Sequence, residues 1–290
     1  MKGAEKSMLQ SARQGAICGG LASFASMAVG LALALTTLLM ATPAKAGRPC
    51  EDKPPQVSAV AKGMELAAHT AKALDASGAQ VLVLARAGQD LSKYGLNYSH
   101  LGFVYRDEAT AGKSGPAVWR VLHKLNHCGT AESALYRQGL GEFFLDSPFR
   151  YEAAFMALTP ELQAKLLPLL QDNSRAAQLN EPRYNMLAYP WGTRYQQSNQ
   201  WAMEMLAVAA NGSVTRTQAQ YWLQQQGYKP TTLHLSALTR LGARVTAANV
   251  AFDDHPDAMR FSDRIQTVTV DSVFDWLPRA GLGAAVVSVR

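Results

Sequence analysis

Two histidines and one serine are the residues of this sequence best suited to acid–base and nucleophilic chemistry. His100 lies in the segment SHLGFVYRD and His123 in AVWRVLHKLN, and both segments are rich in residues that favour β-strands. Ser198 opens SNQWAMEMLA, in which apolar residues recur at helical spacing. Imidazole is a natural general base because its unperturbed pKa of about 6.5 is close to neutral pH. A serine at a helix start, following two strand histidines, is consistent with a nucleophile–base–orienter set. The alternative is that both histidines are ordinary sheet residues, one half-exposed and one bonded to the backbone.

Ser198 also has two simpler interpretations. Serine is a favoured N-cap, because its oxygen accepts a hydrogen bond from a backbone N–H two or three residues further on. The second is a degenerate active site that binds a ligand without chemistry. Whether Ser198 is a nucleophile, an N-cap or part of a degenerate site, the helical spacing of Trp201 and Met205 predicts that its helix has a buried face.

Other candidate sites carry weaker signals. The loop FDDHPD gathers side chains of metal-ligand type, namely Asp253, Asp254, His255 and Asp257. Short acidic loops before strands are common, so we predict no metal there. An aromatic group could line a cleft for a glycan or acyl chain, its members being Tyr184, Tyr189, Trp191, Tyr195 and Trp201. The alternative is that these residues are core and edge packing. Glycine-rich phosphate loops and zinc-type cysteine spacings do not occur in the sequence, so no cofactor is expected.

The first 46 residues have the pattern of a secretory signal peptide. Basic residues precede a long apolar run over residues 17–40, and the run ends in ATPAKA, a small-x-small cleavage pattern. The alternative is an uncleaved anchor, because a run of about 20 apolar residues can span a bilayer. Cleavage after Ala46 predicts a periplasmic or secreted mature protein over residues 47–290.

Cysteine usage agrees with export. Cys18 lies in the leader, so Cys50 and Cys128 are the only cysteines of the mature chain. In an oxidising compartment the economical interpretation is a disulfide between them. The alternative is a nucleophilic Cys128 beside His127.

The charge of the mature chain is small. The whole sequence of 290 residues has a formal net charge of +6, of which the leader carries +3. The rest contains no Lys/Arg block, so a nucleic-acid footprint is not indicated. No later apolar stretch approaches membrane-spanning length, so no transmembrane segment is expected after cleavage.

The elements that must position these residues form an α+β pattern. Helical spacing covers residues 57–76 and 159–171, the second with Thr159 as N-cap and Pro160 at the first position. Strand patterns cover residues 80–87, 99–107 and 117–126, and a later one begins at IQTVTVDSV. The segment SALYRQGLGEFFLD looks helical at first and then irregular. We therefore expect one domain with an antiparallel sheet, a core over about 80–210 and a mostly helical C-terminal extension over 211–290.

The order of these pieces resembles the circularly permuted papain-like proteins, which are related to NlpC/P60 hydrolases and lecithin retinol acyltransferase-like enzymes. In that group a strand histidine precedes the helix that carries the catalytic cysteine. The resemblance implies that His100 is the base, His123 the orienting residue and Ser198 the residue at the nucleophile position. Longer stretches, including YNMLAYPWGTRYQQSNQWAMEMLA and FDDHPDAMRFSDRIQTVTVDSVFDWL, resemble the bacterial domain of unknown function 2145 family.

Serine in place of cysteine bears on the expected function. A helix N-terminus beside an imidazolium stabilises a thiolate, whereas a serine hydroxyl must lose its proton to the base as it attacks. The first expectation is a cell-envelope hydrolase or acyltransferase that acts on an amide or ester bond. The alternative is a non-catalytic protein whose degenerate cleft binds an envelope peptide, glycan or lipid. A third is a structural partner in an envelope complex, engaged through the helical C-terminal part.

Overall fold

The computed structural model describes residues 54–108, 117–146 and 148–290. Its internal contacts divide the chain into two units, Met1–Ala44 and Lys45–Arg290, and every described residue belongs to the second unit. The predicted signal peptide and Cys50 lie outside the described residues. Within the described ranges, no helix is both long enough and apolar enough to cross a membrane.

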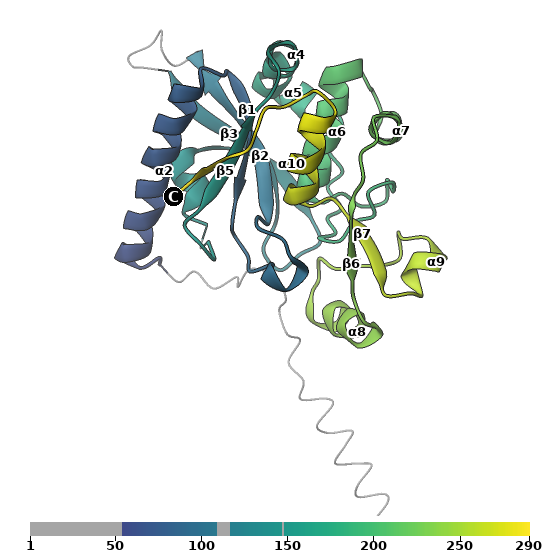
Figure 1. Cartoon of the computed structure of the whole chain (residues 1–290). Helices are drawn as coiled ribbons and strands as arrows, with labels where there is room; N and C mark the ends of the chain where they lie inside the picture. The colour runs from purple at the N-terminus through teal and green to yellow at the C-terminus, as the bar shows by residue number, and fades with distance from the viewer. Residues whose placement is uncertain (1–53, 109–116, 147) are drawn as a thin grey trace, which may run out of the picture. The chain divides into compact units, whose positions relative to one another are not determined.

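A six-stranded antiparallel sheet forms the centre of this unit (Figure 1). The strand order is β4-β3-β2-β1-β5-β8. The strands are β1 (Val81–Arg86), β2 (His100–Asp107), β3 (Val118–Asn126), β4 (Ser133–Gly139), β5 (Ala153–Ala157) and β8 (Val287–Val289). Every residue of β1 is buried, as expected for an apolar strand between two neighbours with both faces covered. The α+β class and the three strands predicted before residue 127 are confirmed.

Helices cover both faces of the sheet. On one face lie α2 (Val57–Ser77) and the short α3 (Leu140–Phe144), which contact each other and share a cluster with Leu82 and Leu84 of β1. On the other face lie α4 (Pro160–Gln171), α6 (Ser198–Asn211) and α10 (Val270–Arg279), which share a cluster with the alternate residues of β1 (Figure 1). The alternation of side chains along a strand thus divides the core into two.

Local sequence explains where several of these helices begin and end. Thr159 caps α4 by accepting a hydrogen bond from Leu162 N at 3.4 Å, as predicted. Gly78 ends α2 in the left-handed conformation, with a φ of 66°, which glycine adopts without steric cost. The short α5 (Asn173–Ala176) and the 3₁₀ turn η1 (Ser92–Tyr94) connect larger elements.

The region after α6 is less helical than predicted. It contains α7 (Arg216–Gln225), α8 (Ala237–Thr246) and α9 (Asp257–Arg260), but also a two-stranded sheet of β6 (Thr231–His234) and β7 (Arg264–Thr267). The strand expected at IQTVTVDSV ends at Thr267, and its second half begins α10, where Thr269 and Ser272 form a capping box.

The segment SALYRQGLGEFF corrects another prediction. Its first half is strand β4 rather than a helix, and only its second half is helical, as α3. Pairing along β3 decides the outcome, because the register runs without interruption from Asn126↔Ser133 to Arg120↔Gly139. Tertiary pairing of this kind overrides a weak helical preference.

Candidate functional site

His100 and His123 contact each other on adjacent strands. His100 is the first residue of β2, and His123 lies on β3. The two rings are joined by a hydrogen bond of 2.8 Å between His100 Nε2 and His123 Nδ1. Gly102 permits this approach, because a Cβ at that position would lie 2.7 Å from the Cβ of His123. The structure therefore brings together the two histidines that the sequence singled out.

The hydrogen bonds behind the histidines determine which ring nitrogen carries a proton. Gln138 Nε2 donates to Glu142 Oε1 at 2.9 Å, so Gln138 Oε1 faces His123 Nε2 at 2.8 Å and must accept from it. His123 Nδ1 is then an acceptor, and His100 Nε2 donates to it. This histidine network, consisting of Glu142, Gln138, His123 and His100, leaves His100 Nδ1 as a lone-pair acceptor. Among the described residues, His100 Nδ1 makes no hydrogen bond.

Both imidazoles are held in the neutral form. Burial lowers the pKa of His100 well below its usual 6.5, and the nearby Arg86 guanidinium lowers it further. Burial and Arg86 also lower the pKa of His123 to about 4, although its hydrogen bond to Gln138 acts in the opposite direction. At neutral pH His100 is therefore an unprotonated base with its tautomer already selected.

This burial predicts an acid-sensitive fold. Between pH 6.5 and about 4 the unfolded chain binds a proton at His123 that the folded protein does not bind. The free energy of unfolding should therefore fall as the pH falls, by roughly 1.4 kcal/mol per pH unit from this group alone. Urea unfolding at pH 7 and pH 5 measures the loss. In His123→Gln the pH dependence should be weaker by about 2 kcal/mol over that interval, and an unchanged dependence would contradict the assignment.

The start of α6 is tied to the beginning of β2. Gln197 is the N-cap, and its Oε1 accepts a hydrogen bond from Asn199 N at 2.8 Å. Asn199 Oδ1 in turn accepts from Leu101 N at 3.1 Å, which links the helix to the residue after His100. Ser198 is the first helical residue, so the interpretation of Ser198 as the cap is wrong.

The Ser198 hydroxyl faces a tyrosine rather than a histidine. Its Oγ lies 3.3 Å from the hydroxyl of Tyr184, and no hydrogen bond joins it to His100. Side-chain alternation explains the separation: Leu101 and Phe103 face α6, whereas His100 contacts Phe143 of α3 on the other side of the sheet. The predicted orienter contact is present, and the predicted nucleophile–base contact is not.

Ser198 and His100 nevertheless line one pocket at the end of the sheet. The pocket has a volume of about 500 Å³, within the range usual for small-ligand sites. Its wall includes the buried Arg86 and the half-buried Asp146, which form an ion pair, as well as Tyr184 and Asn249. The carboxamide oxygen of Asn249 is buried without a hydrogen-bond partner. The site therefore combines an imidazole base, a hydroxyl and an amide around one hollow.

The sequence missed most of this wall. Arg86 is the one charged residue in an otherwise apolar strand, and that anomaly could have indicated it. Asp146 and Asn249 come from loops whose place depends on the fold, and no local pattern distinguishes them. Tyr184 is the one member of the predicted aromatic group that does line this pocket.

The other aromatic residues predicted to line a cleft lie elsewhere. Trp201 is fully buried against Phe103 in the core, so that prediction is wrong. The other three are not part of the pocket wall and make separate contacts: Trp191 with Tyr228, Tyr189 with His255, and Tyr195 with Asp253.

The cysteine and metal predictions have different outcomes. Cys128 is disulfide-bonded, so it is not a free nucleophile. Cys50 is outside the described residues, and its pairing with Cys128 stays a prediction. In the FDDHPD loop Asp254 bonds His255 Nδ1 at 3.0 Å and Tyr189 N at 2.8 Å. No group of three or more potential metal ligands occurs among the described residues.

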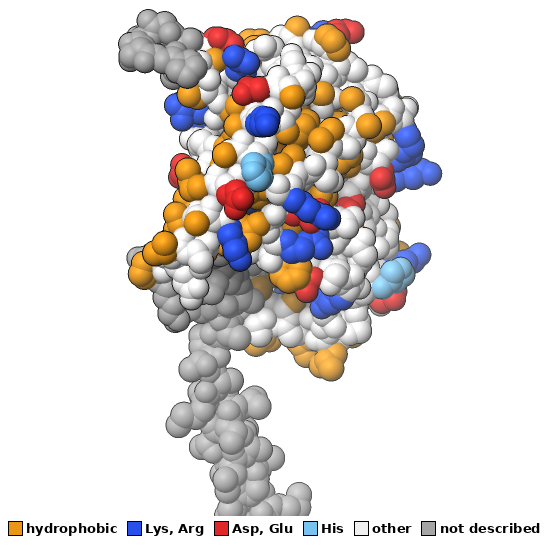
Figure 2. All heavy atoms as spheres, turned by 60° about the vertical axis from the view of Figure 1, so that its left-hand side comes forward, with side chains coloured by type: hydrophobic (Ala, Val, Ile, Leu, Met, Phe, Trp, Pro, Cys, Tyr) orange, Lys and Arg blue, Asp and Glu red, His pale blue; other side chains and the backbone are white. Residues whose placement is uncertain are grey.

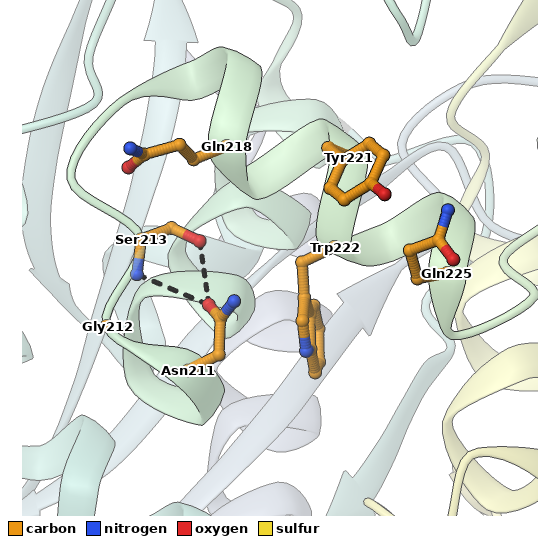
Figure 3. Close-up of a pocket in the computed structure, with 7 residues that line it drawn as sticks. All are labelled: Asn211, Gly212, Ser213, Gln218, Tyr221, Trp222 and Gln225. Carbon is orange, nitrogen blue, oxygen red and sulfur yellow. Dashed lines mark hydrogen bonds between the residues drawn. The ribbon is translucent and has the colours of Figure 1, made fainter.

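A second hollow lies between the end of α6 and α7 (Figure 3). Asn211 Oδ1 accepts hydrogen bonds there from the backbone N and the hydroxyl of Ser213, at 3.2 and 2.7 Å. The remaining wall is formed by Gly212 with the side chains of Gln218, Tyr221, Trp222 and Gln225. None of these side chains is a carboxylate, imidazole, thiol or amine, so this hollow offers no acid–base pair near neutral pH.

Residues 73–277 match the model of the family described as "Uncharacterized protein conserved in bacteria (DUF2145)". No curated protein and no solved structure matches the chain significantly.

Proposed function

We propose that this chain, which belongs to the bacterial family of domain of unknown function 2145, acts on an amide or ester in the cell envelope. It either hydrolyses the bond or transfers the acyl group to a second acceptor. The observation that carries the proposal is the histidine network, which leaves the neutral His100 Nδ1 without a partner in a pocket that it shares with Ser198. A buried network that selects one imidazole tautomer is what general-base catalysis requires. The proposal agrees with the papain-like resemblance of the sequence.

The reaction assigns one role to each residue. Ser198 Oγ attacks the carbonyl carbon while its proton passes to His100 Nδ1, and His123 holds the ring through His100 Nε2. The Tyr184 hydroxyl donates to the developing oxyanion, because burial raises the pKa of Tyr184 and keeps it protonated. His100 then gives the proton to the leaving group, and water or a second acceptor releases the acyl group from Ser198.

The step needs Ser198 to exchange its contact with Tyr184 for one with His100. Catalytic hydrogen bonds are often long or misaligned without substrate and tighten when it binds. Both side chains already border the same pocket. Asn199 anchors α6 to β2, so the side chains of Ser198 and His100, and not the helix, must move to make this contact.

Covalent labelling tests the proposal. A fluorophosphonate probe should label the chain from Gly47 onward at Ser198, and Ser198→Ala should lose the label completely. Ser213→Ala is the matched control, because Ser213 is also buried but lies at the other end of α6. Label that persists in Ser198→Ala, or native protein that takes up none, would contradict the nucleophile assignment.

One observation favours binding without chemistry. The only hydrogen bond that the Ser198 hydroxyl makes within the described chain is to Tyr184. In that case the pocket would hold an envelope peptide, glycan or lipid, and the native protein would resist the probe. A ligand that raises the melting temperature of the native protein and of Ser198→Ala equally would support this second function.

A further inference from the structure

Helix α8 packs on the protein through its less apolar side. None of its residues is buried. Its least exposed residues are Arg240, Ala243 and Thr246, which are half-buried and recur every three positions. At 3.6 residues per turn these three share one face, so this is the side that meets the rest of the molecule.

The apolar residues of α8 point outward instead. Leu238, Leu241 and Val245 are 78%, 61% and 69% exposed and occupy positions i, i+3 and i+7, which place them on the opposite face. Phe261, at the end of α9, is 75% exposed. Figure 2 shows apolar side chains at the lower end of the described molecule, the end at which Figure 1 places α8. An outward apolar stripe is the reverse of the usual orientation of a surface helix.

The charges next to this stripe are mainly positive. Arg244 is exposed on the flank of the stripe, and α8 contains two arginines and no acidic residue. Arg240 Nη1 donates to the carbonyl of Arg260, which joins α8 to α9, and the Arg260 guanidinium lies 5.3 Å from the Phe261 ring centre. The nearby Asp263 is engaged by His234 Nδ1 at 3.0 Å.

We propose that the outer face of α8, defined by Leu238, Leu241, Val245 and Arg244, docks on the surface of a bilayer that contains anionic phospholipid. Exposed aliphatic side chains beside arginines suit the boundary between acyl chains and phosphate headgroups. The charge pattern favours a lipid surface over a second copy of this chain. A bilayer supplies phosphate groups to Arg244, whereas α8 of a second copy contains no acidic residue that could pair with it.

Vesicle binding tests the proposal independently of catalysis. The chain from Gly47 onward contains every described element and lacks the apolar leader. It should co-sediment with vesicles of phosphatidylglycerol and phosphatidylcholine, and much less with phosphatidylcholine alone. The double variant Leu241→Asp/Val245→Asp should bind about 100-fold more weakly. Arg244→Gln should bind about five-fold more weakly, and added salt should reduce that difference.

The matched control is Val57→Asp. Val57 is also a highly exposed valine on a helix, but it lies at the start of α2. It should bind vesicles as the native protein does, and circular dichroism should show the native fold in all variants. Binding that is equal on both vesicle types or unchanged in the double variant would overturn the proposal. The proposal would also be overturned if the native protein did not bind vesicles but self-associated, and if the double variant abolished that self-association. The outer face of α8 would then be an interface with a second copy.

Discussion

Replacing His100 by Gln should slow the labelling of Ser198 by about 10³-fold, within the range that general-base catalysis contributes. The hydroxyl of Ser198 has no negative charge at neutral pH, so its attack depends on a group that takes the proton. Among the described residues that line the pocket, His100 is the only histidine. A glutamine can still donate to His123 Nδ1, so the rest of the histidine network can survive the change.

The control for this substitution is His234→Gln. His234 is exposed and its Nδ1 lies 3.0 Å from Asp263 Oδ2, and it belongs to β6 rather than to the pocket. Its replacement should leave the labelling rate unchanged. His123→Gln should cause a smaller loss than His100→Gln, because His123 acts only through the orientation of His100. Equal labelling rates in the native protein and His100→Gln would remove His100 as the base.

Removing the charge of Arg216 should cost about 3–5 kcal/mol of folding free energy, as for other broken buried ion pairs. Glu204, in the middle of α6, is fully buried. Arg216 Nε and Nη2 donate to its two oxygens at 2.8 and 3.1 Å, and Gln220 Nε2 donates at 2.7 Å. Burial raises the pKa of Glu204, and Arg216 acts against that shift. In Arg216→Met this carboxylate would lose the one guanidinium that binds it among the described residues.

Two comparisons make the test specific. Arg183→Met removes an arginine that is itself largely exposed and contacts Glu181 at 2.8 Å, so it should cost much less stability than Arg216→Met. The double variant Glu204→Gln/Arg216→Met should recover part of the stability lost in Arg216→Met, because the unpaired charge is then gone. Urea unfolding measures all three variants. A loss in Arg216→Met no larger than in Arg183→Met would show that the buried pair does not support α6.

Buried Lys124 of β3 is connected through Gln196 to the Glu204–Arg216 pair. Its Nζ donates to Asn180 Oδ1 at 2.7 Å, Glu181 O at 2.6 Å and Gln196 Oε1 at 2.9 Å. Burial lowers the pKa of Lys124 to about 7. Gln196 Nε2 also donates to Glu204. Gln196, two residues before Ser198, is therefore hydrogen-bonded both to Lys124 of β3 and to the middle of α6. Lys124, Gln196 and Glu204 are far apart in the sequence, but their hydrogen bonds together fix the position of the start of α6, where Ser198 lies.

The sequence by itself determined the class of the fold, the strands that carry both histidines and the helix that Ser198 opens. These features depend on local signals: β-branched runs, Thr159 before Pro160, and apolar residues at helical spacing. It also singled out His100 and His123, because each lies in a strand-forming segment and the papain-like resemblance implies that they are the base and the orienting residue. The family match over residues 73–277 bears out the resemblance seen in the longer motifs.

Only the tertiary structure decided which atoms meet. Strand β4 pairs with β3 although its sequence looks helical, and Gln197 rather than Ser198 caps α6. The face on which a strand side chain lies depends on register, and a shift of one residue reverses it. That is why His100 turns towards Phe143 while Ser198 bonds Tyr184, and why both still border a pocket at the end of the sheet.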